Sequence, residues 1–236
     1  MEGYIIVHGK KSGPSYPACN FHPVVEQLRT HSLVDFESHA WAYDRLYDAP
    51  FESCLTSIRQ SQQRLLDAGA TRIHLLTHSL GGNAAIYYAT QHLDFDSMIL
   101  IAPAHNTHLP AVQKQTAWSV RKAQASLAQG NDDYDHFVDF DTGEITVSRV
   151  KPSIYISYFD SNGPCNMSEN ATRIKAPINV LCLSGRRDIT QATTKDLIYD
   201  LLPKTNQSRF LSLDADHYTS CRDSHDLVVD WVNSLT

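Results

Sequence analysis

The chain has 236 residues, 42% of them hydrophobic and 19% charged, which predicts one domain with a sizeable core and excludes a disordered chain. Its 5 cysteines and 10 glycines exclude a disulfide scaffold and a collagen-like repeat. The 20 basic and 26 acidic residues give a net charge of −6, which argues against nucleic-acid binding, and the longest apolar run, 98–104, is far too short for a membrane span.

Short β-rich apolar runs alternate with longer amphipathic segments through the first 104 residues. Strands are predicted at residues 3–7, 33–41, 72–77 and 97–102. Helices are predicted at residues 23–30, 51–68 and 80–91. This order is typical of βα units on a parallel sheet.

The pattern changes after residue 104 and resumes near residue 174. The intervening segment predicts a helix at 110–129 and a hairpin with strands at 136–140 and 145–150. Further strands are then predicted at 178–183 and 209–213, and helices at 193–202 and 224–235. The chain is therefore expected to form an α/β fold with a mainly parallel, about six-stranded sheet, in which residues 1–104 and 173–236 form the core and 105–172 an insertion.

Residues 77–82 read Thr-His-Ser-Leu-Gly-Gly and lie between a predicted buried strand and a helix. A serine hydroxyl is a weak nucleophile unless it stands clear of its surroundings and faces a base. A sharp strand-to-helix turn would expose Ser79 in this way, with Gly81 allowing strand and helix to approach. The amide of Leu80 would then be able to donate to an oxyanion. The alternative is that Ser79 is an ordinary helix N-cap.

This segment resembles the nucleophile motif G-x-S-x-G of the α/β-hydrolase family, with Thr77 in place of the first glycine. The resemblance covers most of the chain, because the order nucleophile, acid, histidine also fits. It implies that Ser79 is the nucleophile, that Asp188 is the acid and that His217 is the general base. Two alternatives remain at this point. In the first, Asp188 serves only as a turn residue or helix cap; in the second, Asp214 or Asp216 orients His217.

The family places its second oxyanion donor just beyond a His-Gly pair after the first strand. Here that strand is followed by His8, Gly9 and Lys10, which implies the backbone amide of Lys10 as the donor, with Gly9 as the next choice. His8, Gly9, His78 and Gly81 are expected to lie beside the site and to support it. The two histidines are not expected to act as bases. Alternatively, Gly9 only turns the chain.

The family also implies that the insertion is a cap, or lid, that excludes water and shapes the substrate pocket. Aromatic side chains of the insertion either line that pocket or pack the insertion together, and those around the loop after the second strand are equally plausible pocket residues. The candidates are Trp118, Tyr134, Phe137, Phe140, Tyr155, Tyr158, Phe159, Phe36, Trp41, Tyr43 and Tyr47.

The spacing of His105 and His108 would suit a metal, but no HExxH motif or carboxylate cluster accompanies them, so no metal and no cofactor are expected. The odd number of scattered cysteines, without a CxxC motif, favours reduced thiols and a cytoplasmic location. Cys182 is expected in the core and Cys221 at a partly exposed position.

The resemblance implies hydrolysis of a carboxylic ester of a small or acyl-chain substrate through an acyl-enzyme. A thioesterase or a lactonase would use the same three residues, and acyl transfer would require the exclusion of water. An alternative of another class is a non-catalytic ligand-binding protein or receptor on the same fold. The expected partner is thus a small-molecule ester or thioester, and the oligomeric state is left open.

Overall fold

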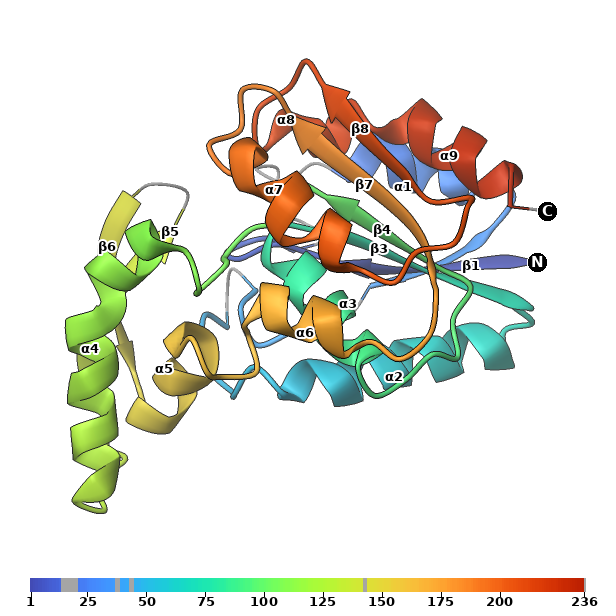
Figure 1. Ribbon diagram of the computed structural model, residues 1–236. Helices are drawn as coiled ribbons and strands as arrows, with labels where there is room; N and C mark the ends of the chain where they lie inside the picture. Colours follow the sequence, from blue (N-terminus) through green and yellow to red (C-terminus); the bar gives the residue numbers. More distant parts are fainter. Residues whose placement is uncertain (14–20, 37–38, 43–44, 142–143, 236) are drawn as a thin grey trace.

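Six strands form one parallel sheet at the centre of the computed structural model, which describes residues 1–236 except 14–20, 37–38, 43–44, 142–143 and 236 (Figure 1). The strand order is β2-β1-β3-β4-β7-β8, and neighbouring strands pair in parallel. The strands are β1 (Glu2–Val7), β2 (Leu33–Phe36), β3 (Arg72–His78), β4 (Ser97–Ile101), β7 (Asn179–Gly185) and β8 (Arg209–Leu213). The prediction of a mainly parallel six-stranded sheet is confirmed.

Helices cover both faces of the sheet, so its central strands are apolar on both sides. In β1, Ile5 belongs to the hydrophobic cluster beneath α2 and α3, whereas Ile6 belongs to the cluster beneath α1 and α9. The helices beside the sheet are α1 (His22–Leu28), α2 (Ser53–Asp67), α3 (Leu80–Ala89), α6 (Met167–Arg173), α7 (Gln191–Leu197), α8 (Thr219–Arg222) and α9 (His225–Asn233).

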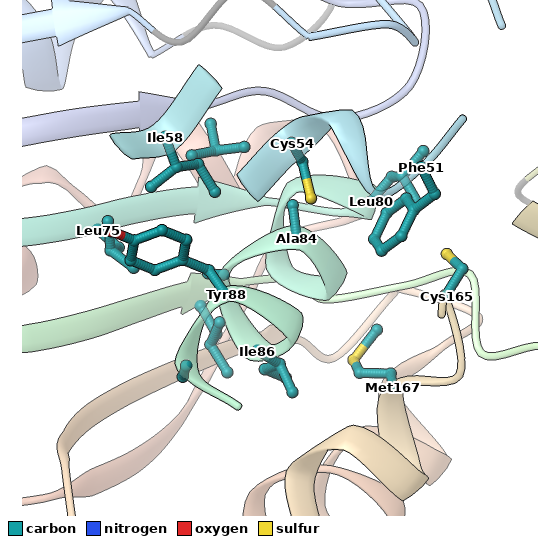
Figure 2. Packing of buried hydrophobic residues seen from close by; sticks show 14 of the residues in the cluster. Phe51, Cys54, Ile58, Leu75, Leu80, Ala84, Ile86, Tyr88, Cys165 and Met167 are labelled. Carbon is teal, nitrogen blue, oxygen red and sulfur yellow. The ribbon is translucent and has the colours of Figure 1, made fainter. Parts of the chain in front are cut away.

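The helix α3 is enclosed by α2, by α6 and by the sheet, and nearly all of its residues are buried. Figure 2 shows Ala84 and Tyr88 of α3 packed between Ile58 of α2 and Met167 of α6. This burial on all sides fixes the start of α3 firmly against the sheet.

An insertion between β4 and β7 projects from one end of the sheet, away from both chain termini (Figure 1). It contains α4 (Pro110–Ala128), β5 (Asp135–Asp141), β6 (Glu144–Val150) and α5 (Pro152–Phe159), and the chain then returns through α6 to the side of α3. Strands β5 and β6 pair in an antiparallel hairpin, as the sequence predicts.

The structure differs from the expected elements mainly where segments are short. Helices α5, α6 and α8 span 8, 7 and 4 residues, too few for helical periodicity to be distinct from an apolar run or a turn. The expected strand at 33–41 ends at Phe36, and the expected helix at 193–202 divides into α7 and a 3₁₀ turn, η1 (Tyr199–Leu201). Among the described residues, no helix is both long and apolar enough to cross a bilayer.

Candidate active site

Ser79 lies in a sharp turn between β3 and α3. Its backbone angles are φ 52° and ψ −122°, in a region that residues other than glycine rarely adopt. A Cβ atom at Gly81 would lie 2.1 Å from the carbonyl oxygen of Val7, so only glycine lets α3 start this close to β1. The Ser79 side chain makes no capping hydrogen bond to α3, and the interpretation of Ser79 as a simple N-cap is wrong.

Thr77 occupies the position where the family motif has a glycine, and its side chain is fully buried. Its hydroxyl donates a hydrogen bond of 2.9 Å to the carbonyl oxygen of Ile99 on β4. The β-branched residue therefore fits because its polar atom is satisfied within the sheet.

Three side chains from three separate loops meet at the carboxyl edge of the sheet. His217 Nε2 lies 2.9 Å from Ser79 Oγ, and His217 Nδ1 lies 2.7 Å from Asp188 Oδ2. Ser79 follows β3, Asp188 follows β7, and His217 follows β8. Because parallel strands place their carboxyl ends at one edge, residues far apart in sequence form one hydrogen-bonded row.

The two other acidic candidates are held elsewhere. The side chain of Asp214 is 80% exposed and lies near Arg187. Asp216 accepts hydrogen bonds from the amide and hydroxyl of Thr219, which closes the loop that carries His217. The carboxylate beside the imidazole of His217 is that of Asp188.

The environment of Asp188 favours its ionised form. Burial acts to raise the pKa of this carboxyl, but hydrogen bonds from His217 and Thr190 outweigh that effect and hold the pKa below its usual value. Asp188 Oδ1 accepts two hydrogen bonds, both of 2.9 Å, from the amide and hydroxyl of Thr190. Asp188 thus both closes the turn before α7 and faces His217.

This lowered pKa predicts a pH-dependent contribution to stability. The folded state holds the Asp188 proton less tightly than the unfolded state, so the contribution is fully present above about pH 4 and is lost as the pH falls through the folded pKa. We expect the difference in urea midpoint between wild type and Asp188→Asn to shrink between about pH 5 and about pH 3. A difference that stays constant or widens over this range would contradict the assignment.

The four residues expected beside the site all lie there. His78 Nε2 donates to the carbonyl oxygen of His217 at 2.8 Å, which fixes the loop after β8. A Cβ atom at Gly9 would lie 2.9 Å from the Cβ of Ser79, so Gly9 allows the loop after β1 to approach the turn. His8 stacks on Phe36 with a centroid distance of 5.6 Å, and Gly81 forms the start of α3 described above.

The loop after β1, residues 8–11, is held by contacts that the sequence did not predict, one of them to a residue, Asp139, that was not a candidate. The indole of Trp41 donates to the carbonyl oxygen of His8 at 2.9 Å, and the amide of Lys11 donates back to the carbonyl oxygen of Trp41 at 2.9 Å. Lys10 pairs with Asp139 of β5. The sequence offers one signal for Asp139: it lies two residues after Phe137 on the same face of the predicted strand, so its carboxylate is expected to be buried with that ring and to need a partner.

A cavity of about 280 Å³ lies beside Ser79, between the sheet edge and the insertion. Apolar side chains make up most of its wall, and the described polar residues there are engaged with protein atoms: Asn106 donates to Ser168, and the hydroxyl of Thr193 to the carbonyl oxygen of Thr190. The lining residues are Lys10, Ser79, Leu80, Pro103, Ala104, His105, Asn106, Leu109, Pro110, Ala111, Val112, Phe140, Ile189, Thr190, Thr193 and Ile198.

Of the aromatic candidates, Phe140 lines this cavity. Most of the others pack the insertion: the ring centroid of Tyr155 lies 4.7 Å from that of Phe137 and 4.5 Å from that of Phe159. Tyr158 packs against Trp41 and Tyr47 in the same interior.

The remaining candidates that the structure describes do not contribute to the cavity wall. Trp118 and Tyr134 are exposed on the surface of the insertion, and Phe36 lies against His8. Tyr43 lies outside the described residues.

The described residues contain no group of three or more histidine, cysteine or acidic side chains that could hold a metal ion. His105 Nε2 instead donates to the carbonyl oxygen of Tyr158 at 2.9 Å. Cys182 is buried in β7, as expected, whereas the expectation for Cys221 is wrong: this thiol is fully buried, because α8 packs against β7. Burial raises the pKa of the Cys182 thiol.

A parallel sheet with a strained serine after its third strand, an acid after β7 and a histidine after β8 defines the class of α/β-hydrolases. Residues 44–217 match the family Hydrolase_4, described as serine aminopeptidase, S33, and the chain belongs to this family. No curated protein sequence matches the chain.

Similar solved structures show the same fold. A monoacylglycerol lipase from Paleococcus ferrophilus has 19% identity and a TM-score of 0.69, with 99% of this chain and 95% of that chain covered. DcsB, in complex with a substrate analogue, has 12% identity and a TM-score of 0.72, with coverage of 99% and 91%. Est1E from Butyrivibrio proteoclasticus, with bound ferulic acid, has 13% identity and a TM-score of 0.61, with coverage of 99% and 90%.

Proposed function

We propose that this protein is a serine hydrolase that cleaves a carboxylic ester through an acyl-enzyme on Ser79. The observation that carries the proposal is the hydrogen-bonded row from Asp188 through His217 to Ser79, with distances of 2.7 and 2.9 Å. A buried carboxylate, an imidazole and a serine hydroxyl at a strained turn, in this order, are the parts needed to activate a serine.

In the first half of the reaction, Ser79 Oγ attacks the ester carbonyl carbon while His217 Nε2 takes its proton. The tetrahedral intermediate collapses when the bond from carbon to the alkoxy oxygen breaks and His217 gives that proton to the leaving alcohol. Water then attacks the acyl-enzyme with His217 again as base, the acid departs, and Ser79 recovers its proton. Asp188 holds the imidazole in the required tautomer and stabilises its cation.

The negative oxygen of the intermediate would be stabilised by the backbone amides of Leu80 and Lys10. Leu80 is the first residue of α3, where an N–H group has no acceptor within the helix. Lys10 follows Gly9, which lies against Ser79, and both Lys10 and Leu80 line the cavity. Two backbone donors beside the serine would suit a developing oxyanion.

The cavity supports an uncharged, apolar acyl group as the part of the substrate next to Ser79. Its polar wall residues are already bonded to protein atoms, so the remaining surface is that of aliphatic side chains and Phe140. The family description raises an aminopeptidase as a second candidate. An amino-terminal substrate carries an ammonium group, yet none of the described lining residues is acidic, and Lys10 is a cation.

The insertion, residues 105–172, would serve as the cap over this cavity. The segment from Ala104 to Val112 and Phe140 of β5 form one side of the wall, and Ile189, Thr193 and Ile198 of the core form another. This enclosure keeps bulk water from the acyl-enzyme except for the molecule that hydrolyses it. Hydrolysis of a thioester or a lactone would use the same three residues, Ser79, His217 and Asp188, so both substrate types are included in the test below.

A series of p-nitrophenyl esters tests the proposal. We expect kcat/KM to rise about tenfold from acetate to butyrate, because each buried methylene contributes about 0.8 kcal/mol, and to fall once the acyl chain outgrows the cavity. Thioester and lactone analogues of the best acyl group are compared in the same assay.

Aminoacyl p-nitroanilides test the aminopeptidase alternative, because they carry an ammonium group where the p-nitrophenyl esters carry an uncharged acyl chain. Faster turnover of these amides than of any ester would favour the aminopeptidase. Tight ester binding without product release, together with no labelling by a fluorophosphonate, would favour a receptor instead.

A further inference from the structure

A buried ion pair joins the loop after β1 to the projecting insertion. Lys10 Nζ lies 2.5 Å from Asp139 Oδ1, and the two side chains are only 4% and 0% exposed. Lys10 belongs to the core, whereas Asp139 belongs to β5, so the contact spans 129 residues of sequence. It is therefore a tertiary fastening between two parts of the molecule that border the cavity.

Asp139 is the centre of a small polar network. Besides Lys10, its Oδ1 accepts a hydrogen bond of 3.2 Å from the hydroxyl of Tyr47, and its Oδ2 accepts one of 2.9 Å from the hydroxyl of Ser148 on β6. The Lys10 ammonium also lies 5.6 Å from the ring centroid of Tyr47. With partners on both oxygens, the carboxylate is held in one orientation, and so is the ammonium that it binds.

Such a pair is a costly way to gain stability. Two charges lose their hydration when they are buried, and apolar side chains of similar volume often stabilise a protein as well or better. Beyond packing, an ion pair fixes the orientation of a side chain, because the ammonium must point at the carboxylate. A fixed orientation of Lys10 matters here, since the neighbouring Lys11 has a positive φ of 53° and the loop must stay in an unusual conformation.

We propose that Asp139 is a positioning residue that acts from the insertion through Lys10. By fixing the Lys10 side chain, it places the Lys10 amide at the distance from Ser79 that the oxyanion requires. The oxyanion hole is then complete only when the β5–β6 hairpin is seated on the core. This inference rests on the proposed hydrolase function, and it adds a residue that sequence reasoning did not select.

The test compares Asp139→Asn with Asp135→Asn. Asp135 lies on the same strand and pairs with Lys122, but that pair is on the surface, with side chains 39% and 31% exposed. For Asp139→Asn we expect kcat to fall about 10- to 100-fold with little change in KM. We expect Asp135→Asn to match wild type in both constants, because exposed pairs contribute little.

Two ligands separate positioning from a merely structural role. A p-nitrophenyl phosphonate reacts with Ser79 through a charged intermediate that needs the oxyanion hole, whereas a non-hydrolysable ether analogue of the ester only fills the cavity. We expect Asp139→Asn to slow phosphonylation by the same factor as kcat and to leave the dissociation constant of the ether unchanged. Loss of ether binding with an unchanged kcat would overturn the proposal.

The double variant Lys10→Met/Asp139→Leu controls for an unpaired buried charge. It removes both charges but keeps apolar volume, so we expect a melting temperature close to that of wild type and a kcat that stays low. If this variant has the wild-type kcat, the ion pair is not needed to orient residue 10, and the proposal is wrong. Failure of the hydrolase function itself would appear differently, as wild-type protein that neither turns over ester nor reacts with the phosphonate.

Discussion

Ser79→Ala is expected to lower kcat for the best p-nitrophenyl ester by about 10⁵- to 10⁶-fold and to abolish labelling by a fluorophosphonate. The hydroxyl of Ser79 lies 2.9 Å from Nε2 of His217, the proposed base, and the proposed acyl-enzyme cannot form without this hydroxyl. The backbone conformation is open to alanine as much as to serine, so the folded structure is expected to be retained. The measurement is steady-state kinetics together with mass spectrometry of the labelled protein.

A serine outside the site gives the matched control. Ser57 lies on α2, and its hydroxyl donates to the carbonyl oxygen of Ser53 within the same helix. Ser57→Ala should keep wild-type turnover and labelling. The proposed nucleophile would be wrong if Ser79→Ala still took up the label or hydrolysed ester at the wild-type rate.

The second large effect concerns the acid. Asp188→Asn is expected to lower kcat by about 10³- to 10⁴-fold, because the amide can present an N–H group to His217 Nδ1 and so favour the wrong tautomer. The loss should fall on kcat rather than on KM, since Asp188 touches the imidazole and not the acyl pocket. The measurement is kcat and KM over a pH series.

Asp214→Asn and Asp216→Asn distinguish a catalytic carboxylate from the neighbouring acids. The side chain of Asp214 is mostly exposed, and its removal is expected to leave kcat unchanged. Asp216 closes the His217 loop with hydrogen bonds that asparagine can still accept, so only a small change is expected there. A loss for either variant equal to that of Asp188→Asn would reject Asp188 as the acid.

The local sequence determined the sheet, most of the helices and the turn at Ser79, but not the short helices α5, α6 and α8. Runs such as Ser97–Ile101 are fully buried and uninterrupted, and such runs identify the central strands of a parallel sheet. Gly81 could be predicted because the elbow needs strand and helix to approach closely, and the structure leaves no room there for a Cβ atom. These features depend on neighbours in the chain, which is why the sequence carries them.

The family resemblance implied Asp188 as the acid, but only the tertiary structure places its carboxylate, rather than that of Asp214 or Asp216, beside His217, since three loops must meet there. The same is true of Asp139, whose partner Lys10 is 129 residues away, and of the cavity wall, where Phe140 takes part and Tyr155 does not. Periodicity states which side of a strand is buried but not what it is buried against. Contacts between distant segments depend on how the loops and the insertion fold back on the sheet, and that path is set by the packing of the whole molecule.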